Sequence, residues 1–519
     1  MKDGTQEIPR PAASPLVGRV ARSERTTLVR AALENAGGGR VHVSGLRGTS
    51  FVLLAEALRD RLSRPLLVIC PDDEAAADTH SDFRTLSSAR ALLLPERDIL
   101  PHRYETRENP TVRGDRNDCL NRIAAGEVDV VVTSLLGFLE KTLRPQTLRT
   151  HRRVIGAGEH LDLEELREYL VVAGYDAVPV VEETGQFAVR GAIVDVFDPS
   201  WDNPARIELF DDEVASIRSF DIDTQRSIAS LESTAILPAT SVPFEEEAVA
   251  GAGDYLRSRG FDEDLVARIE EEVRTHRASY LWRRYAPALG LTGELLEFFP
   301  RPPVVAFSDA ASINRMHRRL RENIARAASH PEDEFPLLAP DDYLHAPDCF
   351  DGRAWATLWR WDLAAQAEAA PEEGEDAGPY PPPTDRETHT RFLTGSHPSV
   401  AGSLEPLVEQ LRKYATKRLD VHVYAETATQ RERLADMLDE AEELVHMPVG
   451  WITSGFVWEE MGLALLTDHQ IFGRMLARPH RREQRRRVQG IRHEHLQLGD
   501  VVVHVDYGIG RFVGLEVLS

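Results

Sequence analysis

Residues 44–52 (SGLRGTSFV) occupy the position of a phosphate-binding loop, because they follow the apolar segment at Val41 and precede a predicted helix. In the pattern G-x-x-x-x-G-K-[ST], the lysine holds the β and γ phosphates and the hydroxyl binds Mg²⁺. Here the second glycine, the lysine and the hydroxyl are replaced by Ser50, Phe51 and Val52. We therefore expect a degenerate loop without a nucleotide, and no cofactor in this chain. Its expected non-binding positions are Gly45, Gly48, Ser50, Phe51 and Val52.

A second candidate site lies in residues 187–223, where apolar residues recur with period two on either side of a proline- and aspartate-rich loop. This pattern predicts paired strands. Ile207 and Leu209 would then share one face, and Arg206 and Phe210 the other. If the Ile207 face is buried, an aromatic and an arginine meet solvent together, a combination that is common in protein-binding hot spots. From the residues alone, the alternative that Phe210 packs under a neighbouring helix is favoured, since most strand aromatics are buried.

Other groups that could support chemistry are few. Eight arginines fall within residues 474–492, but no aromatic residues interleave with them to stack on bases, so a solvated segment is favoured over a nucleic-acid site. No nucleophile elbow and no zinc-protease helix occurs. The triplet His493-Glu494-His495 and His389 lack partners at metal-ligand spacing. We predict no catalytic residue and no metal site.

The elements that would position these residues indicate a multidomain α/β fold. Buried strands are predicted at 41–43, 66–70 and 128–132, with helices at 51–61 and 116–125 between them, a rhythm typical of a parallel sheet. Later elements are predicted as helices at 163–173 (ended by Gly174), 264–285, 404–414 and 430–443, and as strands at 304–307, 421–424 and 462–467.

At the C-terminus, LGDVVVHVDYGIGRFVGLEVL predicts strands at 500–505 and 511–518 around a turn at Gly508 and Gly510. One hairpin is not stable alone in water.

Composition limits the class of protein. The 519 residues carry 61 Lys and Arg against 85 Asp and Glu, a net charge of −24, so the whole chain repels nucleic acid. The three cysteines form no paired framework, as expected in a reducing cytoplasm. No apolar run is long enough to span a membrane, and no signal peptide is visible. We expect a cytoplasmic protein without a membrane partner.

A family resemblance adds a partner. FAVRGAIVDVF, ARIELFDDEVASIRSFD and DTQRS, between residues 187 and 227, resemble the second domain of the bacterial transcription-repair coupling factors (Mfd), which is shared with the excinuclease subunit UvrB. The resemblance implies that this domain docks UvrA. The positions matching the family's docking residues, with the acidic pair beside them, are Arg190, Arg206, Phe210, Asp211 and Asp212.

Further segments are similar to the same family. LPERDILPHRYETRENP and GEVDVVVTSLLGFLE resemble its N-terminal UvrB-like module, whose nucleotide site has decayed, and GFVWEEMGLALLTDHQIFG resembles its third domain. The last residues resemble the CarD-like RNA-polymerase-interaction domain, a small SH3- or Tudor-like barrel, in which Leu518 would contact the polymerase β subunit. The resemblance implies a fragment that lacks the translocase motor. ATP, Mg²⁺ and duplex DNA are then expected only for the missing motor domains.

The expected domains follow from both arguments. They are a flexible tail (1–20), a degenerate UvrB-like domain (21–150), a UvrA-binding α+β domain (151–240), a segment completing the first domain (241–375), an acidic proline-rich linker (376–395), a small α/β third domain (396–477), a basic linker (478–495) and the truncated polymerase-interaction domain (496–519). A UvrB-type excinuclease subunit with ATPase activity is the alternative, and a CarD-like regulator is a weaker one.

Overall fold

The computed structural model describes residues 15–35, 40–97, 110–240, 246–275, 281–328, 335–346, 356–361, 388–397, 404–472, 501–504 and 508–511. Contacts divide the chain into two compact units, Met1–Gly473 and Arg474–Ser519. Among the described residues, no helix has the length and apolar character needed to cross a bilayer.

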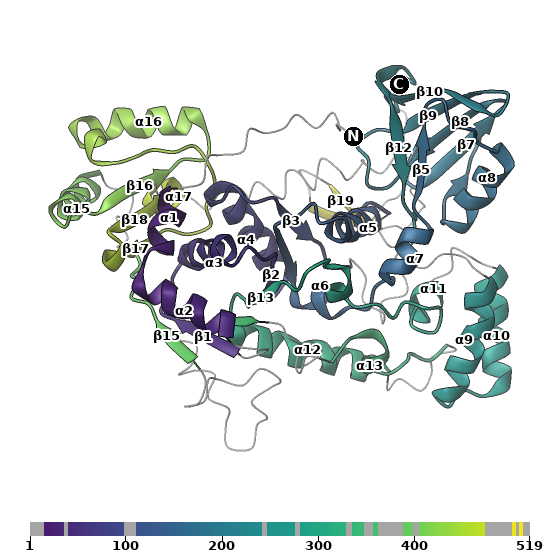
Figure 1. Ribbon diagram of the computed structural model, residues 1–519, viewed down its shortest axis with the longest axis horizontal. Coiled ribbons are helices and arrows are strands. Elements are labelled where there is room, and N and C mark those ends of the chain that lie inside the picture. The colour runs from purple at the N-terminus through teal and green to yellow at the C-terminus, as the bar shows by residue number, and fades with distance from the viewer. Residues whose placement is uncertain are drawn as a thin grey trace. The chain divides into compact units, whose positions relative to one another are not determined.

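The larger unit contains a seven-stranded parallel sheet with the order β15-β1-β14-β13-β2-β4-β3 (Figure 1). Its strands are β1 (Arg40–Ser44), β2 (Leu66–Cys70), β3 (Ala91–Leu94), β4 (Val130–Ser134), β13 (Val304–Phe307), β14 (Thr357–Trp361) and β15 (Thr388–Arg391). The predicted α/β class with a parallel sheet is confirmed. The late strands β13 and β14 lie between β1 and β2, so the chain returns after residue 300 to complete the sheet.

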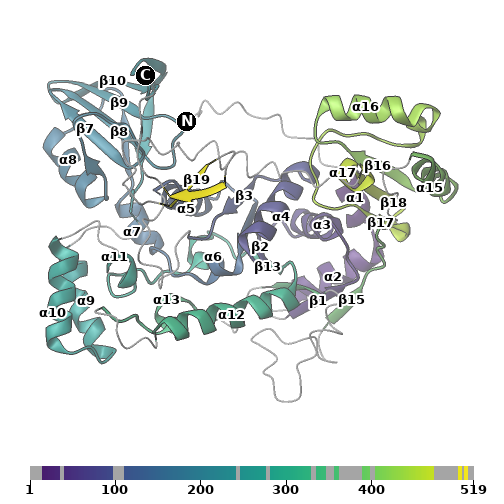
Figure 2. The same ribbon diagram turned by 180° about the vertical axis from the view of Figure 1, so that it is seen from behind.

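Both faces of this sheet are buried, which explains the continuous apolar strands. In β2, Leu66 and Val68 face one core while Leu67 and Ile69 face the other. Figures 1 and 2 show the helices on the two sides. The first core is covered by α1 (Pro15–Ala21), α2 (Glu24–Asn35), α3 (Ser50–Leu62) and α4 (Asp73–Leu86). Contributors to the second core include α5 (Pro110–Ala124), α6 (Leu135–Leu139), α7 (Pro145–Thr150), α9 (Glu246–Ser258), α10 (Glu263–Thr275), α11 (Leu281–Arg284), the 3-10 turn Leu295–Phe298, α12 (Ala310–Ala328) and α13 (Pro340–Tyr343).

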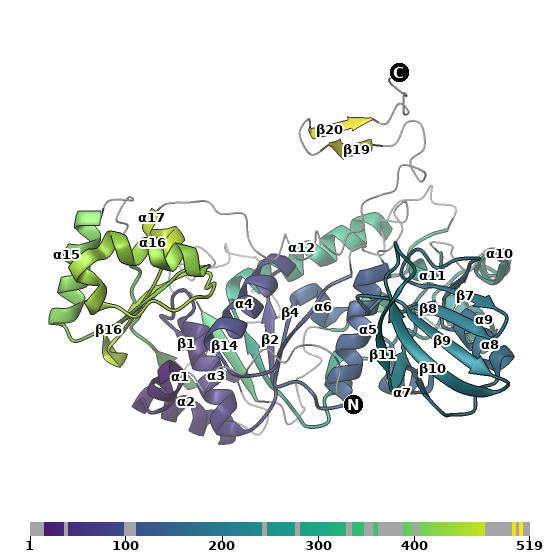
Figure 3. The same cartoon turned by 90° about the horizontal axis from the view of Figure 1, so that it is seen from above.

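A second sheet has six strands in the order β11-β10-β9-β8-β7-β6 (Figure 3). They are β6 (Asp176–Ala177), β7 (Gln186–Arg190), β8 (Ile193–Phe197), β9 (Ala205–Phe210), β10 (Glu213–Phe220) and β11 (Ser227–Leu231). One face packs on α8 (Leu163–Val172), which begins at the N-cap Asp162 and is followed by Gly174 at φ +86°. A small ladder of β5 (Arg153–Gly156) and β12 (Ser233–Ile236) adjoins it in sequence.

A third sheet, with the order β16-β18-β17, forms the third domain with its helices. Its elements are α15 (Leu404–Thr416), β16 (Asp420–Tyr424), α16 (Ala428–Leu438), the 3-10 turn Asp439–Leu444, β17 (Phe456–Trp458), the 3-10 turn Glu459–Met461, β18 (Leu463–Thr467) and α17 (Asp468–Phe472). The strand β17 was not predicted, because three residues are too few to show an alternation.

The structure differs from the linker prediction at its C-terminal end. Thr388–Arg391, expected inside the mobile segment 376–395, form β15 and pair with β1. Their sequence THTR carries no apolar alternation, so the strand depends on tertiary pairing, including the contact between Ser44 Oγ and His389 Nε2 at 2.9 Å. Residues 376–387 lie outside the described part. Of the helix predicted over 264–285, the structure describes α10 as far as Thr275 and α11 from Leu281, and residues 276–280 lie outside the described part.

The smaller unit contains the predicted hairpin, with different strand bounds. Val501–His504 (β19) pair antiparallel with Gly508–Arg511 (β20). Gly508 and Gly510 therefore lie in a strand and not in the turn. Neither Leu518 nor the arginine run at 474–492 belongs to the described residues, so the polymerase contact and the SH3-like fold stay predictions.

Candidate protein-binding surface

The outer face of the six-stranded sheet, opposite α8, carries the residues that sequence reasoning singled out. In β9, Ile207 and Leu209 are buried against α8, so the alternation places Arg206, Glu208 and Phe210 on the other side. The predicted orientation of this strand is therefore confirmed. Phe210 is 75% exposed, which excludes the alternative that it packs beneath a helix.

The strand pattern predicts that Arg206 is exposed to solvent beside Phe210. In the structure, Arg206 is instead bound to neighbouring side chains. Its Nε and Nη2 donate to the two carboxylate oxygens of Asp195 at 2.7 and 2.9 Å, and its guanidinium lies 4.5 Å from the centre of the Phe220 ring. Its side chain is only 19% exposed. The hydrogen bonds to Asp195 raise the pKa of this guanidinium, which fixes its charge.

The carboxylate of Asp195 organises this part of the surface. Asp195 is fully buried on β8, opposite Arg206 on β9, and it also accepts from Arg190 Nη2. A buried carboxylate needs such partners, because its desolvation is otherwise expensive. Asp195 was missed as a site residue, although a single aspartate inside IVDVF already indicates that a cation must lie nearby.

Phe210 is presented by an anchored turn. It pairs with Glu213, so Asp211 and Asp212 form the turn between β9 and β10. Asp211 adopts φ +55°, which aspartate tolerates. The backbone of Asp212 accepts from the Leu161 N–H at 2.7 Å, and both aspartates are exposed. The structure thus brings together an exposed ring, two exposed carboxylates and a fixed arginine pair, an arrangement suited to recognition by another protein.

An exposed apolar side chain that the sequence did not single out is Ile228 on β11, 56% exposed. It lies between Ser227, which pairs with Phe220, and Ala229, which pairs with Ser219. An isoleucine between a serine and an alanine on an edge strand gives too weak a pattern for prediction.

The degenerate phosphate loop is covered by a backbone segment of the third domain. The Thr49 N–H and hydroxyl both point at the Ser454 carbonyl, each at 3.1 Å. Two further hydrogen bonds hold the same segment. The Thr453 N–H donates to Asp82 Oδ1 at 2.7 Å, and the Thr85 hydroxyl donates to the Trp451 carbonyl at 2.6 Å. Phosphate loops bind phosphate through N–H groups at a helix start. Here a neighbouring carbonyl takes that position, and carbonyl oxygens repel phosphate.

This contact leads to a stability prediction for Gly48. Gly48 has φ +52°, and a Cβ there would lie 2.6 Å from the carbonyl oxygens of Ser454 and Gly455. Gly158 has φ +81° but nothing within 4 Å of a Cβ. Gly158→Ala should lower the free energy of unfolding by roughly 1–2 kcal/mol, the cost of a left-handed backbone at a residue with a Cβ. Gly48→Ala should cost about 1–3 kcal/mol more, as overpacking does, in urea unfolding. Equal losses of unfolding free energy in the two variants would show that the third-domain segment moves away from the added Cβ without a cost in stability.

Two segments of the chain match known protein families. Residues 154–241, which contain the six-stranded sheet, match the family model of the UvrB interaction domain, and residues 496–519 match that of the CarD-like/TRCF RID domain. A transcription-repair-coupling factor of Myxococcus xanthus is 27% identical over 530 residues, covering 93% of this chain. The chain is similar to the transcription-repair coupling factors over nearly its whole length. The predicted family resemblance is thereby confirmed, and the UvrB-type alternative is not favoured.

Other coupling factors give the same picture at lower identity. Those of Bacillus subtilis (strain 168) and Staphylococcus aureus (strain USA300) are each 24% identical over 92% of the chain. The chain spans 42–43% of the length of these curated relatives. The similarity therefore covers nearly all of this chain and less than half of each coupling factor.

Proposed function

We propose that this chain recruits UvrA in transcription-coupled nucleotide-excision repair, as the corresponding part of a transcription-repair coupling factor. The observation that carries the proposal is Phe210, an aromatic ring exposed at the end of a rigid strand inside the segment that matches the UvrB interaction domain. The docking residues would be Arg190, Arg206, Phe210, Asp211 and Asp212. Asp195 holds the two arginines in place, and the ring supplies the apolar contact.

The proposal extends to a second partner. The match of residues 496–519 to the CarD-like/TRCF RID domain supports binding to RNA polymerase, with Leu518 against its β subunit. Translocation along duplex DNA with ATP and Mg²⁺, which the family resemblance implies, would belong to motor domains outside this chain. Such a role would be carried out in the cytoplasm, where transcription and repair meet in bacteria.

The direct test is binding of the purified chain to purified UvrA, measured by biolayer interferometry. Saturable binding at a ratio of one to one is the expected result, and an absence of binding at any accessible concentration would contradict the proposal.

Nucleotide binding distinguishes the proposal from an excinuclease-type ATPase. The Thr49 N–H is already bonded to Ser454, and the lysine and hydroxyl positions hold Phe51 and Val52. We therefore expect no heat of binding when MgATP is titrated into the chain up to millimolar concentration. Saturable binding of MgATP would instead support the ATPase alternative.

A further inference from the structure

Three potential metal ligands of the third domain converge at the edge of its sheet that is formed by β16. Asp420 and His422 are two residues apart on β16, and therefore share a face of the strand. His446 lies beside His422, because the His446 N–H donates to the Val421 carbonyl and the Val423 N–H donates to the His446 carbonyl, both at 2.8 Å. Backbone pairing, and not flexible side chains, thus sets the spacing of the three residues.

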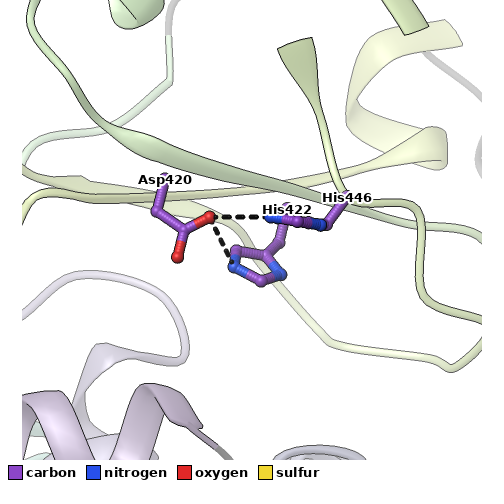
Figure 4. Close-up of side chains that lie close together, drawn as sticks. All are labelled: Asp420, His422 and His446. Carbon is purple, nitrogen blue, oxygen red and sulfur yellow. Dashed lines mark ion pairs between the residues drawn. The ribbon is translucent and has the colours of Figure 1, made fainter. Parts of the chain in front are cut away.

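Their side chains point at one another, as Figure 4 shows. The Nε2 atoms of His422 and His446 each lie 3.2 Å from Oδ1 of Asp420. One ligand atom from each residue can be chosen so that all three lie within 4.8 Å of one another. Two ligands bound to one tetrahedral zinc ion at about 2.0–2.1 Å would lie about 3.3 Å apart, close to the observed spacing.

The nitrogen of His422 favours a metal over a simple ion-pair cluster. His422 Nε2 is buried and lies 3.2 Å from Asp420 Oδ1, which is within ion-pair distance but lacks the alignment of a regular hydrogen bond. A buried nitrogen with a poorly aligned polar contact calls for an explanation such as an ion. Coordination of a metal through its lone pair would satisfy it.

The carboxylate has the support expected of a metal ligand. Oδ2 of Asp420 accepts from Arg19 Nη2 at 2.9 Å, which leaves Oδ1 directed at the two imidazoles. Arg19 also donates to the Gly462 carbonyl at 3.2 Å, so it is itself held in place. Hydrogen-bonded carboxylates of this kind orient metal ligands in known sites.

We propose that Asp420, His422 and His446 bind a divalent transition metal, with Zn²⁺ as the best match. Two imidazoles and one carboxylate form a ligand set that suits zinc, and a fourth position stays open to water or a partner's side chain. Mg²⁺ and Ca²⁺ are excluded as occupants because they require oxygen ligands. The metal would fix His446 against β16, and the site does not depend on the proposed binding of UvrA.

The test uses the untagged full chain, stripped with a chelator and titrated with Zn²⁺ against a chromophoric competitor. One equivalent should bind, and excess Mg²⁺ should not displace it. His446→Gln and Asp420→Asn should each weaken binding by at least the 10- to 100-fold seen when outer-shell partners of a metal are removed. His446 is 70% exposed, so its replacement should leave the fold intact, which circular dichroism checks.

The matched control is His160→Gln, which removes an exposed histidine that lies 3.3 Å from a single carboxylate, Asp212. It should bind Zn²⁺ like the wild type. Visible absorption of the Co²⁺-loaded chain provides a second measurement, because bands typical of low coordination should disappear in His446→Gln. If the wild type binds no Zn²⁺, or if both histidine variants bind it equally, the proposed site is wrong.

Discussion

Phe210→Ala should reduce the affinity of the chain for UvrA at least tenfold while leaving its stability unchanged within about 0.5 kcal/mol. Truncation of a hot-spot aromatic costs more than about 1–2 kcal/mol of binding free energy, and 1.4 kcal/mol corresponds to a factor of ten. The ring is 75% exposed, so the folded chain gains little from it. Biolayer interferometry and urea unfolding of the same preparations measure the two quantities.

Leu28→Ala provides the matched control for this prediction. Leu28 is an apolar side chain of α2 that is 56% exposed, outside the segment that matches the UvrB interaction domain. It should bind UvrA like the wild type, so a loss common to both variants would point to non-specific adhesion of apolar surface. Unchanged binding of Phe210→Ala would place the contact elsewhere. Ile228→Ala then tests how far the surface extends over β11, with a smaller loss expected from a smaller side chain.

How far the sequence predicts this fold depends on whether a strand is specified locally. LLVIC and ARIELF were recognised because burial on both faces or on one face leaves its own pattern. The strand TLWRW was not recognised, because Arg360 interrupts its apolar pattern. In the structure the Arg360 guanidinium donates to the carbonyls of Ser308 and Leu46, at 3.1 and 2.9 Å. A charge in a central strand is thus satisfied by segments remote in sequence, which local patterns cannot show.

The candidate sites follow the same rule. The outward position of Phe210 follows from alternation within one strand. The immobilisation of Arg206 does not, because its partner Asp195 is on the adjacent strand and the register between strands had to be known. The proposed metal site combines both cases: Asp420 and His422 show the two-residue spacing, whereas His446 arrives through pairing across 24 residues. The prediction of no metal site considered residues close in sequence, and a pairing over this distance is not visible at that level.

Arg206→Ala should cost about 3 kcal/mol of unfolding free energy, at the lower end of the loss for breaking a buried ion pair. The change removes two charge-assisted hydrogen bonds from the buried Asp195 and the cation–π contact with Phe220. Arg190 remains bonded to Asp195, which keeps the loss from being larger. Urea unfolding, with hydrogen exchange of the β8 and β9 amides, would measure the loss and locate it.

Two further variants separate the charge from the side chain's volume. Arg190→Ala should cost less than Arg206→Ala, because Arg190 is 44% exposed and Arg206 still occupies both carboxylate oxygens. The pair Asp195→Asn with Arg206→Met should recover much of the stability, since no buried charge is left unpaired. Equal losses for the two single variants would mean that Asp195 is held equally by either arginine. Because Arg206 stabilises the strand that carries Phe210, its effect on UvrA affinity includes a folding component, and Phe210→Ala is the cleaner probe of the contact.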